Sequence, residues 1–210
     1  MSSLEAQANG YGLTIAGGFH PQPQDGLPGN TRTLLLLAPN GSAFWDIVTA
    51  SDFYKDGRAD PIDRWSRHTI GTWACELGAK ALFPFGSLPY HPFHTWALKT
   101  GRCSASPIGF LVHADQGLMI SFRGALALKE HVEVPPPARS PCDTCDAPCT
   151  SACPVAALTR DGYDVSTCKC YLADDPPCMI QGCAVRRACP VSQIFDRPPA
   201  QSAFHMRAFR

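Results

Sequence analysis

The residues best suited to chemistry in this sequence are its cysteines, nine of which fall between Cys142 and Pro190. Two cysteine-dense runs each end in a Cys-Pro pair, Cys153-Pro154 and Cys189-Pro190. Cysteines spaced two or three residues apart, with the last one before proline, are typical of bacterial ferredoxin-type iron–sulfur modules. The stretch therefore predicts thiolate binding of iron–sulfur clusters.

The first run reads Cys142-x2-Cys145-x3-Cys149-x3-Cys153-Pro154, one residue longer than the usual spacing. The extra residue falls among Asp146, Ala147 and Pro148, and a bulge beside the proline can still aim Cys149 inward. In two-cluster modules the cysteine before proline binds the opposite cluster. We therefore predict one [4Fe-4S] cluster on Cys142, Cys145, Cys149 and Cys189, and a second on Cys153, Cys168, Cys178 and Cys183.

The second run is irregular, with Arg186 about where a middle cysteine is expected. We choose Cys178 as the substitute because a loop through Pro176 and Pro177 can bring it back. Cys170 is the alternative eighth ligand, although two ligands separated by one residue seldom serve the same cubane.

Zinc is the main alternative to clusters, because four thiolates also hold Zn²⁺ tetrahedrally. A single cluster with unused cysteines lies between the two. The paired Cys-Pro endings favour clusters, and the odd total of eleven cysteines leaves one over in any all-disulfide scheme. Cys75 and Cys103 are interpreted as a buried small apolar residue and a bystander.

Hydrophobic periodicity predicts the elements that must position this module. Residues 1–31, rich in Gly and Pro, predict a loosely structured arm with turns. Further along, the pattern predicts strands over 33–38 and 81–85 and helices over 43–54, 61–77 and 93–100. Ser42 and Asp60 are the expected caps of the first two helices.

Residues 108–113 and 118–128 predict a β-hairpin around the turn at 114–117. Together these elements predict an α+β (α/β) fold. The expected domains are an α/β domain over 1–133, a Pro-rich linker over 134–141, and a small ferredoxin-like two-cluster module with a C-terminal tail over 142–210.

The amino-acid composition limits the classes of partner that we expect this protein to bind. The formal net charge is zero and the pI is near 7.0, so nothing steers the chain toward nucleic acid or an anionic membrane. No apolar run approaches the ~20 residues that span a bilayer, and the first residues do not read as a signal peptide. We expect a cytoplasmic protein whose partner is a redox protein or a small-molecule substrate. The oligomeric state is not predicted.

The order of an α/β domain, CxxC…CxxxCP and C…GC…CP resembles the epoxyqueuosine reductase family and, more distantly, reductive dehalogenases. The segments 106–113 and 122–126 are similar to those of cobalamin-processing proteins. A closer likeness is to small bacterial ferredoxin-like proteins that pair such a domain with a dicluster module. The resemblance implies a nitroreductase-like fold with a mixed sheet, which in relatives holds a corrinoid (cobalamin) over a sheet face near one cluster.

Two departures separate this chain from the epoxyqueuosine reductases. The stretch 89–94 has no carboxylate where those enzymes carry an acidic proton donor, and their tRNA-recognising C-terminal part is absent. The residues that we nominate as contacts to a corrinoid or other cofactor are Tyr90, His91, His94, His113 and Arg123.

Each nomination has a plainer alternative. His91 and His94 can be exposed loop histidines, and His113 reads better as a structural histidine at a strand end. A buried Arg123 needs an anionic partner, which is either a protein carboxylate or a ligand carboxylate or phosphate.

Together these features predict an electron-transfer or redox protein with two [4Fe-4S] clusters. A sharper version is a reductase whose clusters feed electrons to a corrinoid or flavin in the first domain. The competing class is a non-enzymatic binding or sensor protein in which zinc or one cluster stabilises the fold.

Overall fold

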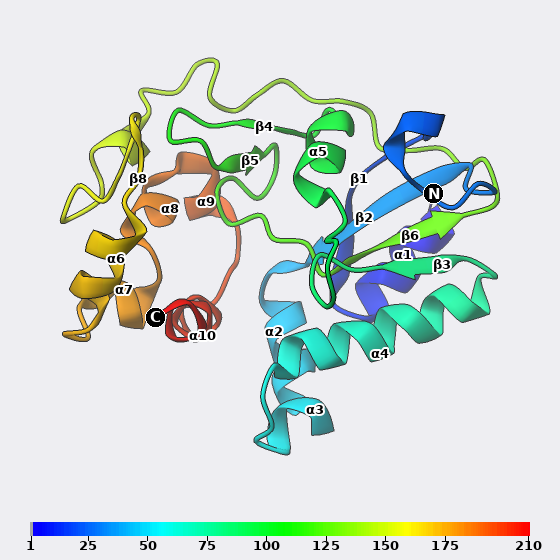
Figure 1. Ribbon diagram of the computed structural model, residues 1–210, viewed down its shortest axis with the longest axis horizontal. Helices are drawn as coiled ribbons and strands as arrows, with labels where there is room; N and C mark the ends of the chain where they lie inside the picture. The colour runs from blue at the N-terminus through cyan, green and yellow to red at the C-terminus, as the bar shows by residue number, and fades with distance from the viewer. Residues whose placement is uncertain (1) are drawn as a thin grey trace. The chain divides into compact units, whose positions relative to one another are not determined.

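The computed structural model describes residues 2–210, which form two compact units (Figure 1). Unit 1 comprises the described residues up to Arg102 together with Ser121–Pro137. Unit 2 comprises Cys103–Ile120 and Ala138–Arg210. The segment 103–120, which was expected in the N-terminal domain, thus belongs with the cysteine-rich part.

Unit 1 is built on a four-stranded sheet in the order β1-β2-β6-β3 (Figure 1). Its strands are β1 (Leu13–Phe19), β2 (Thr33–Pro39), β6 (Gly124–Leu128) and β3 (Lys80–Leu82). Every neighbouring pair is antiparallel. The mixed α and β content is as predicted, but the predicted mixed sheet is wrong, because each strand runs opposite to the one beside it.

The centre of unit 1 is β2, whose Leu34, Leu35, Leu36 and Leu37 are fully buried. Burying such side chains contributes about 1.5–3 kcal/mol each, so this run organises the core. Around the sheet lie α1 (Ser2–Gly10), α2 (Gly41–Ala50), α4 (Pro61–Glu76) and α5 (Phe93–Lys99). Of these, α4 contacts both β3 and β6.

Several predictions for unit 1 are wrong. The expected arm over 1–31 contains α1, β1 and the short 3₁₀ helix η1 (Pro23–Asp25). The expected helix over 43–54 is two helices, α2 and α3 (Asp52–Lys55), separated by an extended Ser51. Neither predicted cap forms: α2 begins before Ser42, and the Asp60 side chain makes no capping hydrogen bond.

The predicted hairpin around 114–117 is also wrong. In unit 2, β5 (Leu111–His113) pairs with β4 (Cys103–Ala105). In unit 1, β6 pairs with β2 and β3. The turn itself exists, closed by the bridge between His113 and Gly117.

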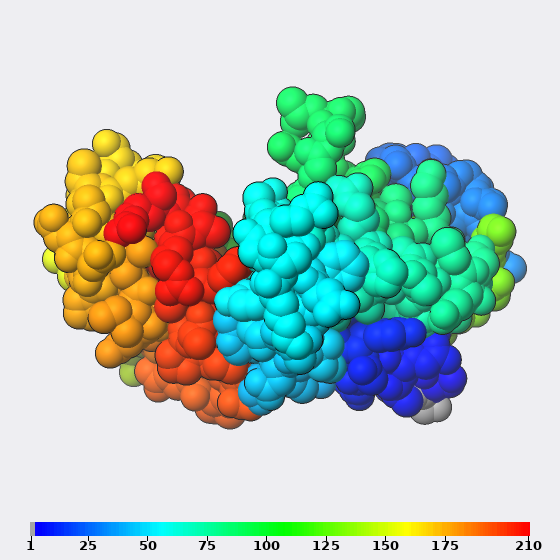
Figure 2. Space-filling model, turned by 90° about the horizontal axis from the view of Figure 1, so that it is seen from below, coloured from blue at the N-terminus to red at the C-terminus, as the bar shows by residue number. Residues whose placement is uncertain are grey.

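The rest of unit 2 consists of short elements that follow one another along the cysteine-rich stretch. These are η2 (Pro148–Thr150), β7 (Leu158–Thr159), β8 (Gly162–Tyr163), α6 (Val165–Leu172), α7 (Pro177–Gln181), α8 (Ala184–Ala188), α9 (Pro190–Ile194) and α10 (Pro199–Phe209). The C-terminal helix α10 packs on α7 and appears in red beside orange segments of this unit in Figure 2. In residues 2–210 no helix has the length and apolarity needed to cross a membrane.

Candidate metal centres

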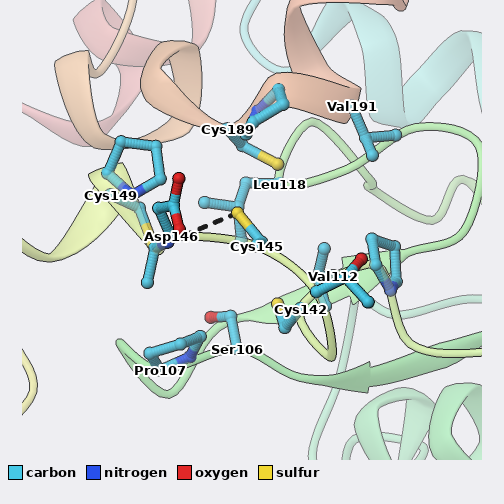
Figure 3. A pocket seen from close by; sticks show the side chains of 15 residues that line it. Ser106, Pro107, Val112, Leu118, Cys142, Cys145, Asp146, Cys149, Cys189 and Val191 are labelled. Atoms are coloured by element: carbon cyan, nitrogen blue, oxygen red, sulfur yellow. Dashed lines mark hydrogen bonds between the residues drawn. The ribbon is translucent and has the colours of Figure 1, made fainter.

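Four cysteines surround one cavity in unit 2, which we call site 1 (Figure 3). Its volume is about 410 Å³, and its cysteines are Cys142, Cys145, Cys149 and Cys189. These are the four residues that the sequence pattern assigns to one cluster. The structure brings them together, although Cys189 is far from the other three in the sequence.

The additional residue of the first run is accommodated at Ala147, which has a left-handed backbone with φ 52° and ψ 51°. Its N–H donates to Cys145 Sγ at 3.4 Å. The chain then enters η2, which buries Cys149. A left-handed alanine costs about 1–2 kcal/mol, so the loop holds this strain in order to turn Cys149 toward the cavity.

Cys189 is placed between α8 and α9, and Gly117 lies against it. A Cβ atom on Gly117 would lie 3.0 Å from Cys189 Sγ and 2.5 Å from the Ser192 nitrogen, and its φ is +57°. Ser192 Oγ accepts a hydrogen bond from the Leu118 N–H at 2.8 Å. Only glycine combines that backbone with so close an approach, whereas the sequence pattern indicates for Gly117 only a place in a turn.

Serine hydroxyls stand near the site 1 thiols. Ser140 Oγ accepts the Cys142 N–H at 3.3 Å and lies 2.7 Å from Ser104 Oγ. Ser106 Oγ is buried, lines the cavity and has no hydrogen-bond partner within residues 2–210. A buried hydroxyl without a partner is costly, so Ser106 is a polar group available to a cavity occupant.

Burial sets the acidity of the site 1 thiols. It raises the pKa of Cys142, although a hydrogen bond with Ser140 opposes the rise. Burial also raises the pKa of Cys149, and the neighbouring Cys189 adds to the rise. Thiolates gathered in this way repel one another and are poorly solvated, and a positively charged iron core would stabilise them.

A second cysteine quartet surrounds a much smaller cavity of about 20 Å³, which we call site 2. Cys168 comes from α6, Cys178 from α7, and Cys183 is the N-cap of α8. Cys153 completes the lining. Cys170 is exposed and is not among the lining residues. The four cysteines are again those that the sequence pattern assigns to one cluster.

The phenol of Tyr163 is hydrogen-bonded to one thiol of site 2. Burial raises the pKa of Tyr163, and a hydrogen bond with Cys168 adds to the rise. Burial raises the pKa of Cys168, which the same hydrogen bond opposes. Asp164 follows Tyr163 and caps α6 by accepting the Thr167 N–H at 2.9 Å. Capping fixes the helix that carries Cys168.

Helix α8 joins the two sites, because Cys183 is its N-cap and Cys189 its C-cap. Val185, on this helix, is 1% exposed and belongs to one apolar cluster with Cys149 and Cys189. Cys153 and Cys183 of site 2 pack against the same cluster. The two quartets therefore share one core.

Arg186 occupies the other face of this junction. Its guanidinium donates to the Leu118 carbonyl and lies 4.9 Å from the centroid of the Phe110 ring. Burial lowers the pKa of Arg186, which the nearby Cys183 and Tyr163 oppose. The residue standing where a further cysteine was expected is thus a half-buried cation beside site 2.

All eleven cysteines are free thiols. Within residues 2–210 no group of three or more His, Cys, Asp or Glu side chains is arranged to hold a single metal ion. A cubane makes a different demand, because each thiolate binds its own iron around a cluster body. The assignment of ligands to two clusters stays a prediction.

The residues nominated in the N-terminal part do not form one site. Tyr90 and His91 line a cavity of unit 1, whereas His94 is exposed and is not among its lining residues. His113 belongs to unit 2, where its Nδ1 accepts the N–H groups of Asp115 at 3.1 Å and Gln116 at 3.3 Å. These bonds are those expected of a structural histidine at a strand end, and a contact of His113 with a cofactor stays a prediction.

Arg123 has a protein partner. Its Nη1 lies 3.1 Å from Asp63 Oδ1, and its side chain is 14% exposed. Burial lowers the pKa of Arg123 and raises that of Asp63, while the attraction between the two opposes both shifts. Of the two partners considered for Arg123, the structure shows a protein carboxylate.

The comparisons with known proteins give little support for an assignment. No protein-family model matches the sequence, and no similar sequence was found among curated proteins. One solved structure, described as the crystal structure of selenomethionine-labeled epoxyqueuosine reductase, is similar with a TM-score of 0.48 at 12% identity. The likeness covers 96% of this chain and 70% of that chain. It is too distant to carry an argument about function.

Proposed function

We propose that this protein is an iron–sulfur redox protein in which site 1 and site 2 each hold one [4Fe-4S] cluster. The observation that carries the proposal is the arrangement of the eight cysteines into two quartets, each around its own cavity. The quartets are crossed, since Cys189 joins the first run and Cys153 the second. This is the connectivity of two-cluster ferredoxin modules.

The residues around site 1 suit a cluster. Among the described residues the Ser106 hydroxyl has no hydrogen-bond partner, and the Ala147 N–H donates to Cys145 Sγ. Hydrogen bonds to cluster and cysteine sulfurs are a normal part of such sites and tune their potentials. When bound, the clusters would supply one-electron transfer.

The protein's own part is to fix the thiolates, to exclude water and to keep the two sites close. Val185 and the apolar cluster around it form the dry contact between them. Arg186 offsets part of the negative charge that the thiolates bring to this buried region.

The predicted corrinoid fits the observed residues poorly. Of the five nominated contacts, Arg123 is paired with Asp63, His113 is bonded within its own turn, and His94 lies outside the cavity. The proposed function therefore does not include a corrinoid. The proposed electron partner is a redox protein or a small molecule, not nucleic acid, and the proposed location is the cytoplasm, where free thiols persist.

The test is a metal analysis of protein purified without oxygen. We expect about eight iron and about eight sulfide per chain, as two [4Fe-4S] clusters require. Cys149→Ala should lower the iron content by about half, whereas the control Cys75→Ala, at an exposed position of unit 1, should not change it. A colourless protein with stoichiometric zinc would overturn the proposal, and a content of about four irons would reduce it to a single cluster.

A further inference from the structure

Unit 1 contains a cavity of about 590 Å³, which we call the basic cavity. This volume is within the range of roughly 300–1,000 Å³ usual for small-molecule sites. The lining comes from the loop after η1, from α4, from β3 and from the loop that follows β3. The residues are Gly26, Leu27, Pro28, Arg67, Lys80, Ala81, Leu82, Phe83, Phe85, Gly86, Ser87, Pro89, Tyr90 and His91.

The formal charges of this lining are all positive. It includes Arg67 and Lys80 but no carboxylate. Among residues 2–210 neither cation takes part in an ion pair. Asp63 is near enough for the charge of Arg67 to affect its pKa, but its ion pair is with Arg123. An anionic ligand would therefore find two cations that the protein does not neutralise.

The Arg67 guanidinium is held in place by aromatic rings. Its Cζ lies 5.5 Å from the ring centroid of Phe83 and 5.6 Å from that of Phe85. Arg123 lies 6.0 Å from the Phe85 centroid. Such cation–π contacts stabilise a guanidinium without occupying its N–H donors, so those donors stay available for a carboxylate or phosphate.

Gly86 allows the loop to approach Arg67 closely. A Cβ atom on Gly86 would lie 3.1 Å from Arg67 Nη2, and its φ of +115° is one that side-chain-bearing residues rarely adopt. The loop conformation and the guanidinium position are therefore coupled through a glycine.

The remaining lining includes aromatic side chains. Tyr90 is 58% exposed, although it is a large aromatic residue. His91 stacks on Trp96 at 5.5 Å between ring centroids with an interplanar angle of 27°. Exposed aromatic groups next to cations suit a ligand that has a ring as well as a charge.

We propose that the basic cavity binds a small molecule in which a carboxylate or phosphate is attached to a flat, apolar ring system. The anionic group would contact Arg67 and Lys80, and the ring would lie against the aromatic residues. That this molecule exchanges electrons with the clusters rests on the proposed function, whereas the binding itself does not.

The test uses matched pairs of probes on the anaerobically purified full chain, with isothermal titration calorimetry as the measurement. The phosphate pair is AMP and adenosine, and the carboxylate pair is indole-3-acetate and indole-3-ethanol. At least one anion should bind at millimolar concentration or below, about tenfold more tightly than its neutral analogue, since a charge-assisted hydrogen bond is worth about that factor. Binding of AMP alone identifies phosphate, and binding of indole-3-acetate alone identifies carboxylate.

Variants separate this site from general charge effects. Arg67→Gln and Lys80→Met should each weaken binding of the anion about tenfold. The controls Arg32→Gln and Lys55→Met, at exposed positions of unit 1 outside the lining, should leave it unchanged. The proposal is overturned if neither anion binds, if the neutral analogues bind equally well, or if Arg67→Gln binds as the parent does.

The iron content of each variant keeps this test separate from that of the proposed function. Arg67→Gln should retain all of the iron found in the parent, because Arg67 lies outside unit 2. If the protein carries zinc but binds the anions through Arg67, the proposed redox function is contradicted and the proposed binding site is still supported.

Discussion

Site 1 and site 2 use the same number of cysteines in the same crossed pattern, yet they are built differently. Site 1 is made of turns, a left-handed alanine and one short 3₁₀ helix around a cavity of about 410 Å³. Site 2 takes three cysteines from the helices α6 and α7 and the cap of α8, around a cavity of about 20 Å³. The first is roomy and the second is tight.

The lining of the two sites differs as well. Site 1 includes the side chains of Ser106, Thr144 and Asp146 among its lining residues. Site 2 is lined by apolar side chains and Tyr171 besides its cysteines. Solvent exposure and hydrogen bonding are the main protein controls on cluster potential. The same ligand set would thus give two clusters of different accessibility and potential, which suits the transfer of electrons in one direction.

Replacing a ligand of site 2 should have the largest effect. Cys178→Ala should remove about half of the iron, because Cys178 is buried in the lining of site 2, where the other thiols among the described residues are the three remaining members of the quartet. Cys170→Ala is the matched control on the same unit and should keep the full content. Iron and sulfide assays with electron paramagnetic resonance of the reduced protein measure both.

The reverse result would correct the ligand set. If Cys170→Ala loses the iron and Cys178→Ala keeps it, α6 supplies two ligands and the lining of site 2 changes on cluster binding. Equal losses would mean that both thiols are needed, and site 2 would then have a ligand geometry other than the one proposed.

Oxidative loss of iron should separate the sites by rate. Besides its cysteines, site 2 is lined by apolar side chains and Tyr171, whereas Ser106, Thr144 and Asp146 line site 1, so a polar oxidant or chelator should reach a cluster in site 1 more readily. Ferricyanide with a chelator should therefore remove iron in two phases, the faster one from site 1. Cys149→Ala should show only the slow phase, and Cys178→Ala only the fast one. A single phase in the parent protein would contradict the comparison.

The cysteine pattern is the part of the candidate site that the sequence reveals best. The Cys-Pro endings and short spacings predict both quartets, with Cys178 chosen over Cys170, and the same eight cysteines line the two cavities. The supporting residues carry no such signal. Gly117 reads as a turn residue, and its contact with Cys189 depends on a fold in which 103–120 joins unit 2. The contacts of Tyr163 and Arg186 with the cysteine sites also depend on the fold, so the spacing of the cysteines does not predict them.

The fold shows the same division. The strand at β2 and the helix α4 follow from continuous and periodic apolar residues, and both form as predicted. The strand β1 was missed because LTIAGGF contains two glycines among its apolar residues. The hairpin was predicted wrongly because two apolar runs that flank a turn usually pair with each other. In the structure β5 pairs with β4 and β6 pairs with β2.

Removing the phenol of Tyr163, which lies beside Cys168, should shift the reduction potential of the site 2 cluster and leave that of the site 1 cluster unchanged. Tyr163→Phe deletes a hydrogen bond to that sulfur. Such a bond stabilises the extra negative charge of the reduced cluster, so the potential of site 2 should become more negative. Tyr171→Phe is the control, since Tyr171 lines site 2 and makes no hydrogen bond to a cysteine among the described residues.

The measurement is a redox titration followed by electron paramagnetic resonance, with Cys149→Ala as background so that only site 2 is observed. Equal shifts in the two tyrosine variants would show that the phenol acts through packing. A shift toward more positive potential in Tyr163→Phe would contradict the hydrogen-bond argument.

The smallest effect concerns two left-handed alanines, Ala147 in site 1 and Ala156 just after Cys153, with φ of 52° and 51°. Glycine relieves a strain of about 1–2 kcal/mol at either position but costs roughly 0.5–1 kcal/mol in backbone entropy. Ala147 is buried whereas Ala156 is exposed, so only Ala147→Gly also loses a buried methyl, worth about 0.8 kcal/mol. Ala156→Gly should therefore stabilise the protein by about 0.5–1 kcal/mol, and Ala147→Gly should be close to neutral. Guanidinium unfolding of the anaerobic protein measures both, and a larger gain for Ala147→Gly would show that the loop of site 1 is more strained than its backbone angle indicates.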